Sequence, residues 1–427
     1  MLATFFRQQL NGVNLHVYPT QRFKTTTLSL FIGTLLDEQV VTQIALIPHL
    51  LLRGNAKFPE TIYFREALDQ LYGASLGFDI SKQGNYQLIQ FRMDVIQDRF
   101  LAAPESTLEQ ALRFLSQTIL NPVMKDGLFV TKYVDAEKYT LQKKLNAIVN
   151  DKGRYAAMRC IQEMFADDPY RLHPLGMTEH LPSITPQSLT NTYQQWIQSS
   201  PIDLYVVGNT SLEEVSSIFT DAWEHNLAPQ NRMTYHKDTY QFTIKPTKTV
   251  NERMNINQGK LNIGLRILNW DSTTQYVTAL IYNGILGAYP HSKLFIHVRE
   301  KESLAYYASS HLDRHKGVIT IQAGIEFADY DKATSIIMQQ LNEMKSGNIN
   351  ELEMRQTKAM ITNQLREIND RSDAMIAFDF HSLFSNLEIP LEDLIAQIDQ
   401  IPLLDIVAFA QEVHVDTIYF LQHEEGE

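Results

Sequence analysis

The feature of this sequence that most constrains its fold is an internal repeat of a hairpin-like segment. LYGASLGFDISKQGNYQLIQFRM, which begins at Leu71, matches LAYYASSHLDRHKGVITIQAGI, which begins at Leu304. The turn glycines Gly84 and Gly317 fall into register in this alignment. Such self-similarity indicates two copies of one fold. The chain has 427 residues, more than the roughly 250 to 300 at which a single core stops growing, which also favours two domains.

The predicted elements follow the same order in both copies. In the first, a strand at 23–34 precedes a helix at 38–53, a helix from Pro59 and a hairpin at 76–95. In the second, a strand at 260–268 precedes helices at 274–286 and 294–299 and a hairpin at 305–323. Several helices and a last strand, at 202–207 or 416–421, follow each hairpin. This order predicts an α+β fold of two tandem homologous domains, each an antiparallel-rich sheet with helices on one face.

The boundary between the two domains is predicted from a change in composition. Residues 227–249 are rich in Pro, Gln, Asn and Lys and show little periodicity, as is typical of a linker. We therefore expect an N-terminal domain at 1–226 and a C-terminal domain at 250–427.

Charge, hydropathy and cysteine content exclude several functions. A net charge of −12 and a pI near 5.6 argue against a nucleic-acid binder, which needs a basic face. The N-terminus turns polar after six residues, and no apolar run approaches the 18 or so needed to span a bilayer, so we expect a cytoplasmic protein. Cys160 is the one cysteine, which excludes an intrachain disulfide and fits a buried small hydrophobe in a reducing compartment.

The stretch Ser292–Tyr307, SKLFIHVREKESLAYY, contains the strongest candidates for function, Arg299 and Tyr306. On a helix, their spacing of seven residues is two turns and places both on one face. A guanidinium beside a phenol would offer two donors to a carbonyl or a developing oxyanion. An amphipathic helix that leads into a strand also shows Arg and Tyr at this spacing for structural reasons. In the repeat they correspond to Glu66 and Gly73, so only one copy has the pair and the fold does not require it.

Other polar residues are better explained by structure than by function. His311 and His315 have i, i+4 spacing, but a hairpin turn would not bring them together. The remaining interpretations are a surface or capping role for His291 and His297, a solvated charged face for Glu300 and Glu302, and a helix break at Asp370, Arg371 and Asp373.

The duplicated α+β pattern, HPLG at 173–176 after a helical run, and LFIHVREKESLAYY in the second half resemble the M16 or pitrilysin-type peptidases, the inverted zincins. The resemblance covers essentially the whole chain and implies the LuxS/MPP-like M16 fold. In that family two halves close around a peptide. One half carries a zinc site, and the other supplies an arginine and a tyrosine to the substrate and transition state. The resemblance assigns these two roles to Arg299 and Tyr306.

The zinc motif of the family, H-x-x-E-H, is degenerate here. The family's HFLEHMLFKG is matched by ALIPHLLLRG at 45–54, in which Ala45 and Pro48 replace the first histidine and the catalytic glutamate and only His49 remains. In the downstream E-x6-E pattern Glu137 is kept, but the ligand position falls on Lys144. Three protein ligands are the usual minimum for catalytic zinc. In the second copy the corresponding stretch, ALIYN at 279–283, supplies no ligands either, so we expect no metal and no peptidase activity in this chain alone.

Two functions follow from the resemblance. In the first, the chain is the non-catalytic subunit of a heterodimeric zinc peptidase, whose homologous catalytic partner carries H-x-x-E-H and the zinc, and which acts on peptides; alone, the chain could form a homodimer. In the second, it is an inert scaffold or peptide-binding protein of the same fold. A processing subunit is disfavoured, because GILGAYPHSKLF, from Gly284, lacks that subunit's extended glycine-rich loop.

Overall fold

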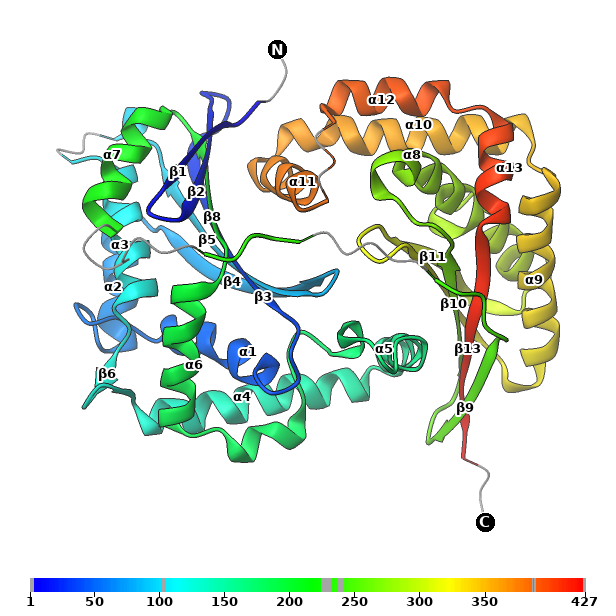
Figure 1. The fold of residues 1–427 in the computed structure, drawn as a ribbon, viewed down its shortest axis with the longest axis horizontal. Helices are drawn as coiled ribbons and strands as arrows, with labels where there is room; N and C mark the ends of the chain where they lie inside the picture. Colours follow the sequence, from blue (N-terminus) through cyan, green and yellow to red (C-terminus); the bar gives the residue numbers. More distant parts are fainter. Residues whose placement is uncertain are drawn as a thin grey trace.

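The computed structural model describes residues 4–101, 105–223, 232–236, 242–385, 387 and 389–424. These residues form two halves, each built on one main β-sheet, with helices around and between them (Figure 1).

The first half contains a six-stranded sheet, a two-stranded ribbon and seven α-helices in its described residues. Its strands are β1 (Phe6–Leu10), β2 (Val13–Pro19), β3 (Thr25–Leu35), β4 (Ser75–Gln83), β5 (Tyr86–Ile96) and β8 (Ile202–Gly208), with the ribbon β6 (Met124–Lys125) and β7 (Leu128–Phe129). Its helices are α1 (Val41–Leu51), α2 (Thr61–Gln70), α3 (Thr107–Leu120), α4 (Thr131–Asn150), α5 (Lys152–Met164), α6 (Pro186–Ser199) and α7 (Leu212–Trp223), with short 3₁₀ turns η1 (Asp98–Phe100), η2 (Pro169–Arg171) and η3 (Thr178–Ser183).

The second half contains a five-stranded sheet. Its strands are β9 (Lys248–Met254), β10 (Gly259–Ile267), β11 (Ala305–Asp313), β12 (Val318–Ile325) and β13 (Val413–His423). Its helices are α8 (Ser272–Asn283), α9 (Tyr330–Ser346), α10 (Glu351–Glu367), α11 (Ser372–Phe384), α12 (Leu391–Gln400) and α13 (Leu403–Gln411). The π-helical segments η4 (Gly284–Ala288) and η5 (Phe295–Lys301) and the 3₁₀ turns η6 (Phe327–Asp329) and η7 (Ile368–Asp370) complete it.

The two sheets have the same topology, which confirms the predicted duplication. The first sheet has the order β1-β2-β8-β3-β5-β4 and the second β11-β12-β10-β13-β9. Read from its other edge, the second order matches the first strand for strand, with β1 as an extra edge strand. The pairs β2/β8 and β9/β13 are parallel, and the other pairs in both sheets are antiparallel. The α+β prediction with antiparallel-rich sheets is therefore confirmed.

The pairing registers change the residue-level alignment of the two copies. The first hairpin closes at Gln83 and Tyr86, and the second at Asp313 and Val318, so the second turn is two residues longer. When the two hairpins are aligned at these closing pairs, Ala305 is equivalent to Leu76. Ala305 pairs with Ile325 and Leu76 pairs with Met93, and these two partners are equivalent as well. The sequence alignment through the turn glycines was therefore wrong for the strands that flank the turns.

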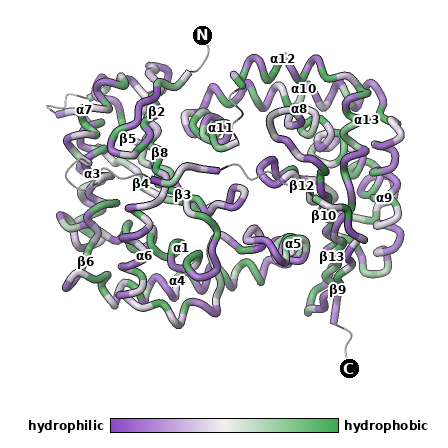
Figure 2. Tube along the Cα trace, in the orientation of Figure 1, coloured by the Kyte–Doolittle hydropathy of each residue, from purple (hydrophilic) through white to green (hydrophobic). Residues whose placement is uncertain are grey.

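Each sheet has an outer face that packs against helices of its own half. In β3, Leu28, Leu30 and Ile32 are fully buried in a cluster with residues of α1, α3, α4, α6 and α7. The second core has the same layering, with Leu261, Ile263 and Leu265 of β10 packed among residues of α8, α9 and α13. Figure 2 shows hydrophobic and hydrophilic residues alternating along outer helices such as α9 and α12, as expected of helices with one buried face.

The inner face of each sheet is covered by a helix from the other half. Helix α11 packs on the first sheet, where Phe380 stacks on Phe31 of β3 with ring centroids 4.1 Å apart. Helix α5 packs on the second sheet, where Cys160 lies against Tyr419 and Leu421 of β13. Both helices lie between the halves in Figure 1. Because each half covers the sheet of the other with one of its helices, the two halves pack together as one unit.

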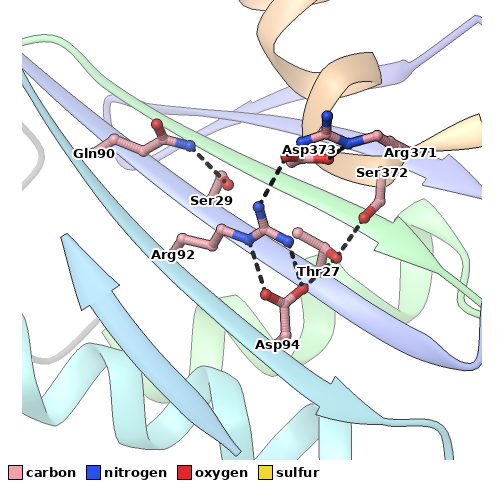
Figure 3. A network of polar contacts seen from close by, with 8 residues as sticks. All are labelled: Thr27, Ser29, Gln90, Arg92, Asp94, Arg371, Ser372 and Asp373. Carbon is pink, nitrogen blue, oxygen red and sulfur yellow. Dashed lines mark hydrogen bonds and ion pairs between the residues drawn. The ribbon is translucent and has the colours of Figure 1, made fainter. Parts of the chain in front are cut away.

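A polar network fixes the start of α11 on the first sheet (Figure 3). Arg92 of β5 donates to Asp94 at 2.8 Å and forms an ion pair with Asp373 of α11 at 3.1 Å. Thr27 of β3 contacts both the Asp94 carboxylate, at 2.6 Å, and the hydroxyl of Ser372, at 2.7 Å. The inner-face polar groups of this sheet are thus paired with one another and with the helix that covers them.

The strands β1, β2, β6, β7 and β9 and the helix α7 were not predicted. β9 begins at Lys248, two residues before the predicted start of the C-terminal domain at 250. Residues 232–236 lie along the first sheet, where Tyr235 packs on Tyr86 and Phe380. The linker positions 227–231 and 237–241 are outside the described residues, so the domain bounds 1–226, 227–249 and 250–427 stay a prediction.

Candidate functional site

The degenerate zinc positions meet where α1 lies against α4. Ala45, Pro48 and His49 lie on α1, and Lys144 lies on α4 two turns after Glu137, on the same face of the helix. The ring of His49 is buried edge-on against Phe78 of β4, with centroids 4.7 Å apart. The two helices thus bring together the positions that the sequence resemblance selected.

The polar side chains at this place form a series of contacts that runs from Lys144 through His49 and Glu137 to Arg53. Lys144 Nζ lies 3.5 Å from His49 Nε2, and His49 Nδ1 lies 3.5 Å from Glu137 Oε2. Arg53 Nε donates to the other carboxylate oxygen of Glu137 at 2.5 Å. Because an ammonium can only donate, Nε2 is the acceptor and the proton of the neutral ring lies on Nδ1, toward Glu137. Each charge therefore faces an opposite charge or a neutral partner.

The residues present do not fit a zinc ion. Ala45 and Pro48 offer no side-chain donor atom, and a third position is occupied by a cation, Lys144, beside the one remaining imidazole. Within the residues that the structure describes, no group of three or more His, Cys, Asp or Glu side chains could hold a metal ion. Arg53, just after the end of α1, was missed in the sequence analysis, although its spacing of four residues from His49 within the predicted helix at 38–53 indicates a shared face.

Burial and Lys144 lower the pKa of His49 from 6.5 to about 4. Burial also lowers the pKa values of two other histidines, His173 beside Lys82 and His315 in the second hairpin turn, to about 4. These three rings are therefore neutral in the folded protein at pH 7.

Acidification should destabilise the protein most steeply between pH 6.5 and 4. In this window the unfolded chain takes up protons on His49, His173 and His315, while the folded chain takes them up only near pH 4, so stability falls as pH falls. We expect a loss of about 1–3 kcal/mol for each histidine. Urea unfolding at pH 7, 5.5 and 4.5 measures this dependence. Lys144→Gln removes the neighbouring positive charge and should make His49's share of the loss smaller; equal stability at all three pH values would contradict the expectation.

Arg299 and Tyr306 do not lie on one helix, which corrects the expectation from their spacing. Arg299 lies in the π-helical segment η5, which ends at Lys301, and Tyr306 belongs to β11. Ser303, between them, has a left-handed backbone with φ of +51°. Pairing of β11 with β12 shifts between Ala305 and Tyr307, so Tyr306 is the extra residue of a β-bulge. A helical wheel therefore does not describe their relation.

Both side chains are exposed. Tyr306 is 66% exposed, and its hydroxyl donates to Glu326 Oε1 at 3.1 Å, a contact that raises the pKa of the phenol. The guanidinium of Arg299 lies over the ring of Phe295, 4.7 Å from its centroid. Within the described part of the chain, Arg299 makes no hydrogen bond or ion pair with another residue, so its donors are free for a ligand or another chain.

Left-handed residues precede the hairpin in both halves, at Tyr72 and Gly73 and at Ser303, but among the described residues here a π-helix and a bulge occur only in the second half. In the first half, α2 is a regular α-helix and the β4/β5 hairpin pairs without interruption. In the second half, a π-helix, a left-handed Ser303 and a bulge follow one another within a few residues. Tyr306 consequently has no counterpart in the first copy, and the correspondence of Tyr306 with Gly73 was wrong. Glu326 was missed because its contact with Tyr306 depends on this bulge.

The other candidates have structural explanations. His311 is exposed on β11, whereas His315 is half-buried in the turn against Phe384 and His381. His291 lies 3.0 Å from the Thr357 hydroxyl and stacks on Tyr289. The predicted helix break is confirmed by the interruption between α10 and α11, and Glu302 forms an exposed ion pair with Lys332 at 2.8 Å.

Cys160 is a free buried cysteine, and burial raises the pKa of its thiol to about 12. No helix in the described residues is long and apolar enough to cross a membrane.

Comparison with known proteins finds one family along the chain. The family described as "Peptidase M16 inactive domain" matches residues 183–361. The "Probable inactive metalloprotease YmfF" of Bacillus subtilis is 36% identical over 416 residues, which cover 97% of each chain. A conserved protein of Enterococcus faecalis has a solved structure with a TM-score of 0.93 and 30% identity, over 99% of this chain and 100% of that one. A "peptidase M16 inactive domain" structure from Pseudomonas fluorescens, 15% identical over 99% of both chains, shares the fold with a TM-score of 0.79.

Proposed function

Because this chain belongs to the M16 peptidase family as an inactive metallopeptidase homologue, we propose that it is the substrate-positioning subunit of a two-chain zinc peptidase. A homologous partner with H-x-x-E-H supplies the zinc and the general base. Arg299 and Tyr306 of this chain bind the peptide and its developing oxyanion at the partner's metal. We place the complex in the cytoplasm, which fits the single reduced thiol of Cys160.

The observation that carries the proposal is the exposed Arg299–Tyr306 pair on an irregular backbone. π-Helical turns and β-bulges cost stability and concentrate at functional sites, where they aim a side chain. Here they occur in the copy that has the pair and are absent from the equivalent part of the other copy. Arg299, which has no polar partner among the described residues, has all its donors available to a carbonyl oxygen.

The division of labour has a physical basis. A metal and its general base must be held on one rigid element, whereas donors that grip a substrate carbonyl can come from a facing chain. In this chain the place of the metal is filled by the contacts between Lys144, His49 and Glu137. The first half, with the degenerate zinc positions, retains only the packing of the fold, whereas the second half retains the hydrogen-bond donors Arg299 and Tyr306.

One observation favours the alternative, an inert M16-fold scaffold or peptide-binding protein. The Tyr306 hydroxyl already donates to Glu326 and must leave that carboxylate before it can donate to a substrate. In the scaffold alternative, the Tyr306–Glu326 contact is purely structural and the bulge only shapes a binding surface.

Purification of the chain alone and together with an M16-like partner encoded beside it tests the proposal. Zinc content, particle mass and cleavage of a mixed peptide library are measured for each preparation. We expect zinc and chelator-sensitive cleavage with the partner and neither with the chain alone, as a monomer or homodimer. One equivalent of zinc in the chain alone, or chelator-sensitive cleavage by it, would sink the proposal. A complex that binds peptides without any cleavage would favour the scaffold.

A further inference from the structure

A cavity of about 310 Å³ lies between the inner face of the second sheet and helix α5. The sheet contributes a polar wall made by Asn262 of β10 and by Thr320 and Gln322 of β12, and α5 contributes an apolar wall that includes Met158 and Ile161. Asn262 and Gln322 are directly paired across the two strands. The cavity is therefore polar on one side and apolar on the other, as ligand sites commonly are.

The polar wall of the cavity is not satisfied by the protein. Asn262 is only 3% exposed, yet its side-chain amide makes no hydrogen bond to any described residue. The side chains of Thr320 and Gln322 likewise have no hydrogen-bond partner in the described part of the chain. Thr320 and Gln322 are half-buried, and all three side chains line the cavity, so their unpaired polar groups can be reached by a ligand there. These groups are free to bind a ligand.

The equivalent place in the first half is filled and paired. Matched at the closing pairs of the hairpins, Asn262 is equivalent to Phe31 and Gln322 to Gln90. Phe31 stacks on Phe380 of the covering helix, and Gln90 donates to Ser29 at 3.2 Å (Figure 3). The fold therefore permits an aromatic ring to fill this place on the inner face of the sheet. In the second half the same place is a cavity lined by polar side chains.

The charged groups beside the cavity are already engaged. Lys82 Nζ donates to the backbone carbonyls of Tyr170 and Leu172 at 2.6 and 3.2 Å. Asp313 accepts from the Tyr170 hydroxyl and from the backbone amides of His315 and Lys316. Apart from the imidazole of His311, which also lines the cavity, the groups left for a ligand among the described lining residues are neutral amides and a hydroxyl, which match a neutral group that both donates and accepts hydrogen bonds.

We propose that this cavity binds the carboxamide side chain of a glutamine or asparagine in a bound peptide. A carboxamide offers one carbonyl acceptor and two N–H donors to Asn262, Gln322 and Thr320, and its methylene groups pack on Met158 and Ile161. Pockets for small ligands begin at about 300 Å³, so this one holds one or two residues. That the bound carboxamide belongs to a peptide rests on the proposed function. That the cavity binds a carboxamide does not depend on it.

The test uses the full chain labelled with ¹³C at its methionine and isoleucine methyl groups. N-acetyl-glutamine methylamide should shift the Met158 and Ile161 methyl resonances with a dissociation constant on the order of 1 mM, as expected for a ligand of this size. The analogues with glutamate or norleucine in place of glutamine should bind at least about tenfold more weakly, because they leave the amides of the cavity unpaired or bring a charge into it. Acetamide should also bind more weakly than the blocked glutamine, because it lacks the methylene contacts.

Asn262→Leu should weaken binding of the glutamine probe at least about tenfold while leaving the melting temperature unchanged or higher, since it removes an unpaired buried amide. Gln90→Leu, at the first-half position equivalent to Gln322, is the matched control and should bind the probe like the unmodified chain. No methyl shift at 10 mM probe, equal binding by the Asn262→Leu variant, or equal binding of the glutamate analogue would overturn the proposal. If acetamide binds as tightly as the blocked glutamine, the proposal that the bound carboxamide belongs to a peptide side chain is overturned. Binding is measured without a partner chain, so failure here leaves the role of Arg299 and Tyr306 untouched.

Discussion

Replacing Arg299 by alanine should lower peptide turnover by the two-chain complex about 10- to 1000-fold, the loss seen when one donor to an oxyanion is removed. The side chain is exposed, and among the described residues its guanidinium lies only against the ring of Phe295, so the variant should fold and assemble normally. If the guanidinium acts on the transition state, the loss should appear in kcat rather than KM. Steady-state kinetics of the purified complex measure both constants.

Tyr306→Phe examines the second donor of the same pair and should lower kcat within the same range of about 10- to 1000-fold. The substitution keeps the ring and removes only the hydroxyl that donates to Glu326. Tyr72→Phe, an exposed tyrosine just before the first-half hairpin, and Arg355→Ala, an exposed arginine of α10, are matched controls and should leave kcat unchanged. Full activity of both the Arg299 and Tyr306 variants with the partner would show that the pair is structural, as the scaffold alternative requires.

Replacing Phe380 by alanine should destabilise the chain by about 3–5 kcal/mol, the usual cost of removing a buried aromatic ring. Phe380 belongs to α11 of the second half but is buried against Phe31 and Tyr205 of the first sheet. The change therefore removes packing between the halves and leaves a cavity on the inner face. Denaturant unfolding followed by circular dichroism measures the loss.

The place where Phe380→Ala acts distinguishes an interlocked chain from two independent domains. Hydrogen exchange should increase in β3 and β8 of the first half, because α11 covers them. Leu404→Ala, at a position that is 78% exposed, is the control and should change stability by less than about 0.5 kcal/mol. A loss below about 1 kcal/mol, or faster exchange confined to the second half, would contradict the interlocking described here.

Much of the fold follows from local patterns in the sequence. The strand at 23–34 and the helix at 186–197 were predicted to within a few residues, because each has a clear periodicity and recognisable ends. Helix α7 was missed although its signals are present: Val215, Phe219 and Trp223 recur at helical spacing after Ser211, which accepts from the Glu214 amide. Strand β9 was missed because its side chains alternate between exposed and half-buried and include few large apolar residues.

The candidate site was predictable only in part. The loss of the zinc ligands at Ala45, Pro48 and Lys144 can be read from residue identity alone, because a methyl group, a proline ring and an ammonium cannot bind zinc in any fold. The relation of Arg299 to Tyr306 could not be read in this way. It depends on where a π-helix ends and on a bulge that is defined by pairing with β12.

The sequence by itself determined the duplication, the order of most elements, the family and the degenerate metal positions, because periodicity, repetition and residue type are local properties. Only the tertiary structure decided that α5 and α11 cover each other's sheets, that Tyr306 is an inserted bulge residue, and that Asn262 faces a cavity without a partner. These features depend on pairing registers and on contacts between segments far apart in the chain. A two-residue difference between the hairpin turns was enough to shift the sequence alignment of the two copies, because register in a sheet is set by the partner strand.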